Sequence, residues 1–120
     1  MPKLTVFSRQ TPEASYDHPR PDRVVKGNPL RTTHEHYQTP GEQVSAGIWA
    51  CEPGAWNIAF APDKHEFFCV IEGRIRITDH HGDAAEFTSG EACVIPPGFT
   101  GTFEVLEPVR KYYVLMNTPS

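Results

Sequence analysis

The clearest strand and turn signals of the chain lie in the stretch over residues 54–101. It reads GAWNIAFAPDKHEFFCVIEG over residues 54–73 and GEACVIPPGFTG over residues 90–101, with a polar hairpin between them. Short runs of apolar, β-branched and aromatic residues are separated by glycine and proline, which is typical of strands joined by tight turns. Six residues separate Glu66 from Gly73, and five separate Gly90 from Pro96. This stretch predicts the centre of a β domain.

Strand signals continue on both sides of that stretch, and no window has the period of a helix. Such a pattern predicts an all-β sandwich or barrel. The expected strands cover residues 44–51, 55–61, 65–71, 74–79, 84–87, 92–95, 100–106 and 109–116.

The part of the chain before these strands is interpreted as an arm. Residues 1–43 are rich in proline and charge, with one short strand signal at residues 3–7. The strand-rich domain is expected over residues 44–120. Because an arm has little to bury against alone, and because sheet edges need cover, we expect a homodimer in which the arm or an edge strand crosses to the partner.

Composition limits the classes of function. The net charge of −4 over 120 residues argues against nucleic acid or an anionic membrane as a partner. The cysteines Cys51, Cys69 and Cys93 include no C-x-x-C pair, which indicates reduced thiols in a cytoplasmic protein. No apolar N-terminal run resembles a signal peptide or a spanning helix.

The spacings around Glu66 and Gly90 match the two cupin motifs, G-x5-H-x-H-x3-4-E-x6-G and G-x5-P-x-G-x2-H-x3-N, except at the histidines. Further matching residues occur in this order: Gly47-Ile48-Trp49, Pro53-Gly54-Ala55-Trp56, Glu66-Phe67, Ile71-Glu72-Gly73, Thr78-Asp79, Pro97-Gly98-Phe99-Thr100-Gly101 and Val109-Arg110-Lys111-Tyr112-Tyr113. Together they resemble the small single-domain cupins of the (S)-ureidoglycine aminohydrolase cupin domain family, a domain-of-unknown-function type related to the ethanolamine-utilisation cupin. The resemblance covers about residues 44–116 and implies a cupin-type antiparallel jelly-roll β-barrel, here with an N-terminal arm.

The resemblance also implies where a metal would bind, and this chain departs from the pattern there. The usual ligand positions of the first motif fall on Phe60 and Pro62, and that of the second motif falls on Gly101, which leaves Glu66. One carboxylate does not hold a transition metal, so no metal cofactor is expected, with a divalent metal on an unusual ligand set as the alternative. The family's aminohydrolases also carry a tyrosine and a lysine near their last strands. Tyr113 matches that tyrosine, and asparagine stands at the lysine position.

Glu66 is the main candidate catalytic residue. It shares a strand face with Phe68 and should point into the barrel, where a carboxylate must be hydrogen-bonded, paired or protonated. Two interpretations stay open: an anchor or general acid/base for a polar ligand, or a structural carboxylate bonded to backbone or paired with Lys111. Lys111 and Tyr113 share one strand face and are expected to support Glu66 as donors.

Trp56, Phe60 and Phe68 are the candidate ligand-binding residues, expected to form the apolar wall of a pocket or, alternatively, plain core. The function expected from these residues is to bind or convert a small polar molecule in the barrel without the usual metal. Two alternatives remain. One is a metal-dependent aminohydrolase-like or isomerase-like enzyme, and the other is a non-catalytic barrel for assembly or sensing. The histidines at 34, 36, 80 and 81 are interpreted as surface residues.

Overall fold

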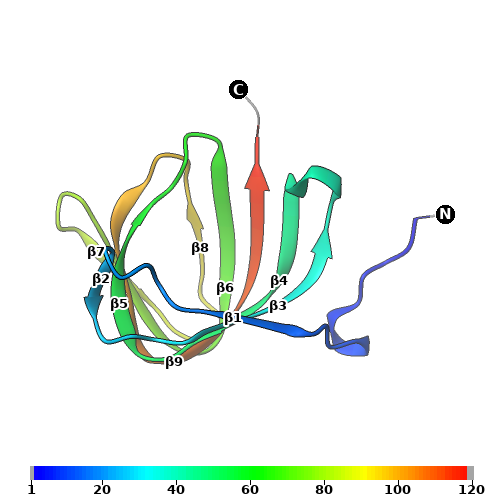
Figure 1. The fold of residues 1–120 in the computed structure, drawn as a ribbon, viewed down its shortest axis with the longest axis horizontal. Helices are drawn as coiled ribbons and strands as arrows, with labels where there is room; N and C mark the ends of the chain where they lie inside the picture. Colours follow the sequence, from blue (N-terminus) through cyan, green and yellow to red (C-terminus); the bar gives the residue numbers. More distant parts are fainter. Residues whose placement is uncertain (1, 119–120) are drawn as a thin grey trace.

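The computed structural model describes residues 2–118, which form strands joined by short turns (Figure 1). The outer ends of the expected arm and barrel, residues 1, 119 and 120, lie outside the described residues. The strands are β1 (Ala14–Asp17), β2 (Val24–Lys26), β3 (Arg31–Gln38), β4 (Val44–Cys51), β5 (Gly54–Ala59), β6 (Lys64–Asp79), β7 (Ala84–Phe87), β8 (Ala92–Ile95) and β9 (Thr100–Asn117).

The predicted all-β class is confirmed. Within the described residues the helical elements are two three-residue 3-10 turns, η1 (Phe7–Arg9) and η2 (Pro40–Glu42). In residues 2–118, no helix reaches the length and apolar character that a membrane crossing requires.

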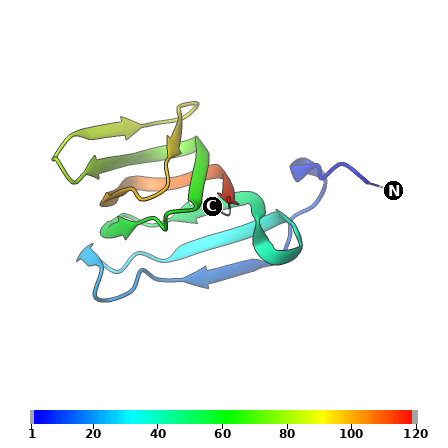
Figure 2. The same ribbon diagram turned by 90° about the horizontal axis from the view of Figure 1, so that it is seen from above.

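Two long strands, β6 and β9, pair with each other and run through the whole molecule. The second part of β9 also pairs with β4, and its first part pairs with β5. We call the region of β1, β3, β4 and β8 the β4 half, and the region of β2, β5 and β7 the β5 half. Each half includes the parts of β6 and β9 that pair with it. All pairs are antiparallel, and the nine strands form one strongly curled sheet, as expected for a jelly roll (Figures 1 and 2).

The long strands bend where Gly73 approaches Pro108. The pairing register shifts at this place, so the proline, which has no N–H, lies where the ladder is already interrupted. Gly73 has a φ of 92°, and a Cβ atom there would meet the carbonyl oxygen of Pro108 at 2.1 Å. Glycine is therefore required at the bend. The sequence predicted a turn between two strands at each of these positions, which was wrong because the bulge keeps both strands continuous.

The core lies inside the curl and draws side chains from both halves. Inward and outward residues alternate along the strands, so that Phe68 is fully buried while Phe67 is 42% exposed. Trp56 stacks on Phe103 with ring centroids 5.1 Å apart. Each large apolar side chain buried in this way contributes about 1.5–3 kcal/mol. The remaining members of the core are Cys51, Val70, Ile75, Ile77, Ile95, Val105 and Val109.

The segment before Val44 differs from the expected arm. β3 pairs along its length with β4, β1 pairs with β3, and β2 pairs with β5. The strand signal at residues 3–7 does not produce a strand, because Phe7 begins η1. The part before β1 is the arm, and Figure 1 shows it projecting from the β3 side of the sheet.

Candidate functional site

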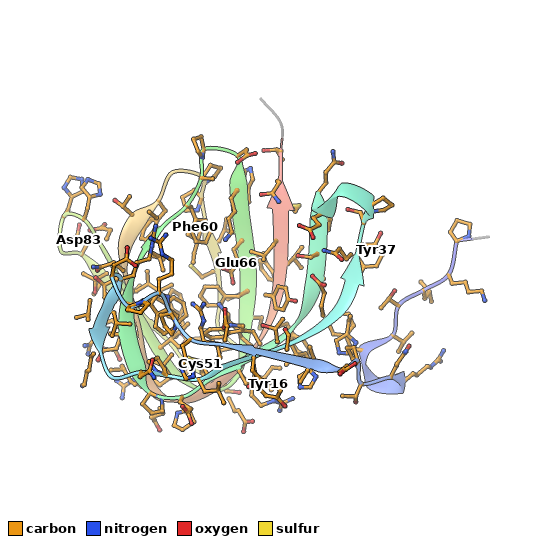
Figure 3. All side chains as sticks on the ribbon, viewed as in Figure 1. Tyr16, Tyr37, Cys51, Phe60, Glu66 and Asp83 are labelled. Atoms are coloured by element: carbon orange, nitrogen blue, oxygen red, sulfur yellow. The ribbon has the colours of Figure 1, made fainter. Side chains whose placement is uncertain are left out.

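An open pocket of about 390 Å³ lies on the inner face of the β4 half. Its wall comes from six strands, β1, β3, β4, β5, β6 and β9, together with the loop that follows β5. We call it the barrel pocket. Figure 3 shows Glu66, one of its lining residues, in the middle of the curled sheet. The volume lies within the range of about 300–1,000 Å³ that is typical of small-molecule sites.

Glu66 and Lys111 form an ion pair in the wall of the barrel pocket. Glu66 lies on β6 and Lys111 on the neighbouring β9, and both side chains point inward because of strand alternation. Lys111 Nζ donates a hydrogen bond of 2.8 Å to Glu66 Oε2. The side chain of Lys111 is only 5% exposed and that of Glu66 only 12%. This pairing was one of the two interpretations of Glu66 that the sequence left open, and the structure contains it.

Three aromatic rings surround the Lys111 ammonium group. Nζ lies 4.5 Å from the ring centroid of Phe68, 4.6 Å from that of Trp49 and 4.8 Å from that of Phe103. These are distances at which a cation is attracted to the face of an aromatic ring, most strongly where water is excluded. The rings compensate part of the hydration that the ammonium loses on burial, and they fix its position beside Glu66.

Tyr113 lies two residues after Lys111 on the same face of β9, and it lines the same pocket. Within residues 2–118 no residue makes a hydrogen bond with its hydroxyl group. Burial raises the pKa of Tyr113 to about 12, and the negative charges of Glu35 and Glu66 act in the same direction. The phenol therefore stays protonated at neutral pH and has a hydrogen to donate to a bound molecule.

The mouth of the barrel pocket contains further charged residues. Arg31 on β3 holds Asp17 on β1 through two hydrogen bonds of 2.8 and 2.7 Å. Lys64 Nζ lies 4.6 Å from the ring centroid of Phe60. Arg31 and Asp17 were not predicted as site residues, because both lie in the part of the chain that was interpreted as an arm.

The six predicted site residues separate into two groups. Glu66, Lys111, Tyr113 and Phe60 line the barrel pocket together. Trp56 and Phe68 do not line it and belong to the buried core. Phe68 still contacts the site from below through the Lys111 ammonium.

Two aromatic residues of the site, Trp49 and Phe103, were missed by the sequence analysis. The alternation along residues 44–51 places Trp49 on the face opposite Val44, Ala46 and Ile48, so hydrophobicity alone gave no signal that Trp49 points inward. The register that places it opposite Lys111 appears only in the structure.

The residues present do not fit the usual cupin metal site. Phe60, Pro62 and Gly101 occupy three of its ligand positions, and a Cβ atom at Gly101 would meet the carbonyl oxygen of Thr78 at 2.1 Å. Glu66 already binds an ammonium group. Across residues 2–118 there is no group of three or more His, Cys, Asp or Glu side chains that could hold a metal ion.

Comparison with known protein families gives a match over more than half of the chain. The family model described as the EutQ-like cupin domain matches residues 38–113. No curated protein matches the chain.

Solved structures share the fold. A protein of unknown function of the DUF861 family from Pseudomonas syringae pv. tomato has a TM-score of 0.76 at 19% identity, over 87% of this chain and 44% of that chain. The EutQ protein of Clostridium difficile has a TM-score of 0.63 at 23% identity, over 75% of this chain and 64% of that chain. The chain thus spans less than two thirds of the length of these two proteins.

A DUF861 family protein from Thermotoga maritima is 30% identical, with a TM-score of 0.51 over 55% of this chain and 73% of that chain. The curled antiparallel sheet, the two motif frames around Glu66 and Gly90, and the family match over more than half of the chain agree with one another. The chain belongs to the EutQ-like cupin domain family.

Proposed function

We propose that this cupin binds a small polar molecule in the barrel pocket, with Tyr113, Glu66 and Lys111 as its hydrogen-bonding groups. The observation that carries this proposal is the buried Glu66–Lys111 pair beside a tyrosine hydroxyl that no described residue binds. A barrel that served only to hold itself together would gain more from apolar side chains at these positions, because a buried ion pair rarely stabilises a protein more than well-packed hydrophobic residues do.

The three polar groups define the chemistry of the ligand. Tyr113 donates a hydrogen bond, so the ligand should carry an acceptor. Glu66 uses Oε2 for Lys111, and Oε1 has no hydrogen-bond partner within the described residues, so the ligand should also carry an N–H or O–H donor. Short amides, hydroxy acids and amino acids have both kinds of group. If the molecule is also converted, Glu66 is the group placed to move a proton, and Lys111 balances its charge.

A second candidate function is a metal-dependent aminohydrolase-like or isomerase-like reaction. Tyr113 favours it, because that residue matches the tyrosine of the (S)-ureidoglycine aminohydrolases and lines the pocket. The residues at the metal-ligand positions argue against a metal-dependent reaction, since Phe60, Pro62 and Gly101 have no ligating side chain. A non-catalytic barrel for assembly or sensing is the third candidate, and a pocket that rejects every small polar molecule would favour it.

A thermal-shift screen tests the proposal. Short amides, hydroxy acids and amino acids at millimolar concentration are the probes, and a ligand that binds only the folded state raises the Tm. We expect at least one probe to raise the Tm of the wild type and to lose this effect in Tyr113→Phe. Tyr16→Phe is the matched control, because Tyr16 is 65% exposed and lies outside the barrel pocket, and it should respond like the wild type.

Two results would contradict the proposal: no probe shifts the wild type, or Tyr113→Phe responds to every probe as the wild type does. For any probe that binds, NMR spectra of the mixture over time separate binding from conversion. New resonances that fail to form with Glu66→Gln would indicate catalysis.

A further inference from the structure

One charged residue of the barrel pocket, Glu35 on β3, is not part of the hydrogen-bonding set of Tyr113, Glu66 and Lys111. It is the last of three alternate residues of β3 whose side chains line the pocket. Glu35 also precedes residues 38–113, which the family model matches. Its presence in the pocket wall is therefore a feature of this chain that the family match does not explain.

Glu35 brings an uncompensated negative charge to the pocket. The charged side chains that line the pocket are three carboxylates and three cations. The two ion pairs of the site neutralise four of them, which leaves Glu35 and Lys64. Arg9 of the arm borders another hollow together with Glu35. Within residues 2–118, however, neither Arg9 nor any other cation forms an ion pair with Glu35.

The two remaining charges are not equivalent. Lys64 Nζ lies 4.6 Å from the ring centroid of Phe60, so the ring compensates part of its charge. Lys64 is also at the beginning of β6, whereas Glu35 lies well inside β3. The charge in the pocket wall that most needs a partner from outside the protein is therefore that of Glu35.

Gly47 on β4 allows the Tyr113 side chain to reach Glu35. The register places Gly47 opposite Glu35 on one side and opposite Tyr113 on the other. A Cβ atom at Gly47 would lie 2.9 Å from the Tyr113 hydroxyl oxygen and 3.1 Å from Glu35 Cα. The phenol thus lies across the space that a side chain at this position would fill, and its hydroxyl group ends beside the backbone of Glu35.

The Tyr113 hydroxyl group provides a second, independent sign of a ligand. Tyr113 is only 5% exposed, and among residues 2–118 no group binds its hydroxyl. Glu35 and Glu66 both act to raise its pKa, in addition to burial, which agrees with a hydroxyl group near two carboxylates. A hydroxyl group has one hydrogen to donate and lone pairs that accept. It can therefore bind an acceptor and a donor of the same ligand.

We propose that the barrel pocket selects ligands with a protonated amino group and that Glu35 is the residue that binds this group. The inference rests on the proposed function, because it specifies which small polar molecules the same pocket prefers. An ammonium group donates three hydrogen bonds, and Glu35 supplies the charged acceptor while the Tyr113 oxygen supplies a neutral one. The aromatic side chains of the pocket wall also attract a cation, as they do for Lys111.

Two probes of nearly the same size test the inference. Glycinamide and glycolamide share an amide, and at pH 7 they differ by an ammonium group in place of a hydroxyl group. Neither carries a carboxylate, so Lys64 does not bias the comparison. NMR titrations at low salt should show that the wild type binds glycinamide about three- to tenfold more tightly, as expected for a charge pair at a partly exposed site.

Glu35→Gln should remove most of this preference, by weakening the binding of glycinamide and leaving that of glycolamide unchanged. Glu35→Lys should reverse the preference, because like charges then meet. Glu107→Gln is the matched control: Glu107 is exposed and lies outside the barrel pocket, and its loss changes the net charge by the same amount. This control should keep the wild-type preference. If one Glu35 variant fails to give a folded circular dichroism spectrum, the other provides the test.

Three results would overturn the inference. They are equal affinities of the wild type for the two probes, a preference that survives in the folded Glu35 variants, and a preference lost equally in Glu107→Gln. In each case the binding of either probe would leave the proposed function standing. Failure of both probes to bind the wild type would also overturn the inference. The proposed function itself would fail only if the wider thermal-shift screen gave no response.

Discussion

Lys111 Nζ lies 2.8 Å from Glu66 Oε2, and this pair joins β6 to β9 inside the curl of the sheet. The arrangement makes the two residues interdependent. Removing one partner of a buried ion pair leaves the other without compensation, which typically costs about 3–5 kcal/mol. We therefore expect Glu66→Gln to lower the free energy of unfolding by about this amount, as measured by urea denaturation.

A second glutamate on β6, Glu72, supplies the control for this substitution. Glu72 pairs with Arg110 at 3.2 Å, but its side chain is 60% exposed, so Glu72→Gln should cost less than about 1 kcal/mol. Adding Lys111→Met to Glu66→Gln should restore most of the lost stability, because an unbranched apolar chain fits among the three rings. A double variant less stable than Glu66→Gln alone would show that the pair is not the source of the loss.

The hydroxyl group of Tyr113 should lose its proton only at high pH. Its pKa is raised to about 12, chiefly by burial, from an ordinary value near 10. An ultraviolet titration of the wild type minus that of Tyr113→Phe should therefore show a phenolate step near pH 12. A step near pH 10 would mean that the ring is open to water.

Tyr113 also adds a pH dependence to stability. Because its folded pKa lies above its unfolded pKa, the folded state holds the proton more tightly, and the stabilisation is fully present below about pH 10. It is lost as the pH rises from about 10 to 12. Wild type should thus lose more stability than Tyr113→Phe over this interval in denaturation experiments. Equal losses in the two proteins would contradict the assignment.

Gly73 should tolerate no other residue. Alanine there would have a strained φ of 92° and a Cβ atom 2.1 Å from the oxygen of Pro108. Gly82 has nearly the same φ, 93°, but no atom within 4 Å of an added Cβ. Gly82→Ala should therefore show the backbone strain alone, about 1–2 kcal/mol. Gly73→Ala should lose at least twice as much in the same denaturation measurement, and equal losses would contradict the steric argument.

Metal content provides a further prediction. Protein purified without a histidine tag should contain no stoichiometric manganese, iron, nickel or zinc by elemental analysis, because the positions of Phe60, Pro62 and Gly101 offer no ligand. Glu66→Gln should leave the metal content unaltered. Near-stoichiometric metal that disappears in Glu66→Gln would reverse this prediction and favour the metalloenzyme alternative.

Most strands of the fold could be predicted from the sequence, because one face of each is buried and its apolar residues alternate. The strand at residues 44–51 and the strands that became β7 and β8 were predicted with their observed bounds. β3 was missed since its sequence, RTTHEHYQ, is polar throughout and its side chains are half-buried or exposed. No period of two in hydrophobicity can arise from such a strand.

The candidate site was predictable to a similar extent. The alternation of inward and outward side chains along each strand was enough to predict that Glu66, Lys111 and Tyr113 point inward and that Phe60 lines a pocket. The alternation could not distinguish the aromatic residues at the pocket wall from those in the core. That distinction depends on how far the sheet curls, so the sequence left open whether Trp56 and Phe68 would line the pocket or belong to the core. The contributions of Arg31 and Asp17 depend on strands that the sequence pattern does not reveal.

The position of β9 has a consequence for biosynthesis. It is the last strand in chain order, yet it lies between β4 and β6 in one half and between β5 and β6 in the other. A nascent chain that has released β4 to β8 from the ribosome can form the local pairs of β6 with β7 and β8, while β4 and β5 still lack their central neighbour. The cooperative fold must therefore wait until Thr100–Asn117 has emerged, and its many distant pairings should make folding slow. Until then the unpaired edges of β4 and β5 are open to aggregation.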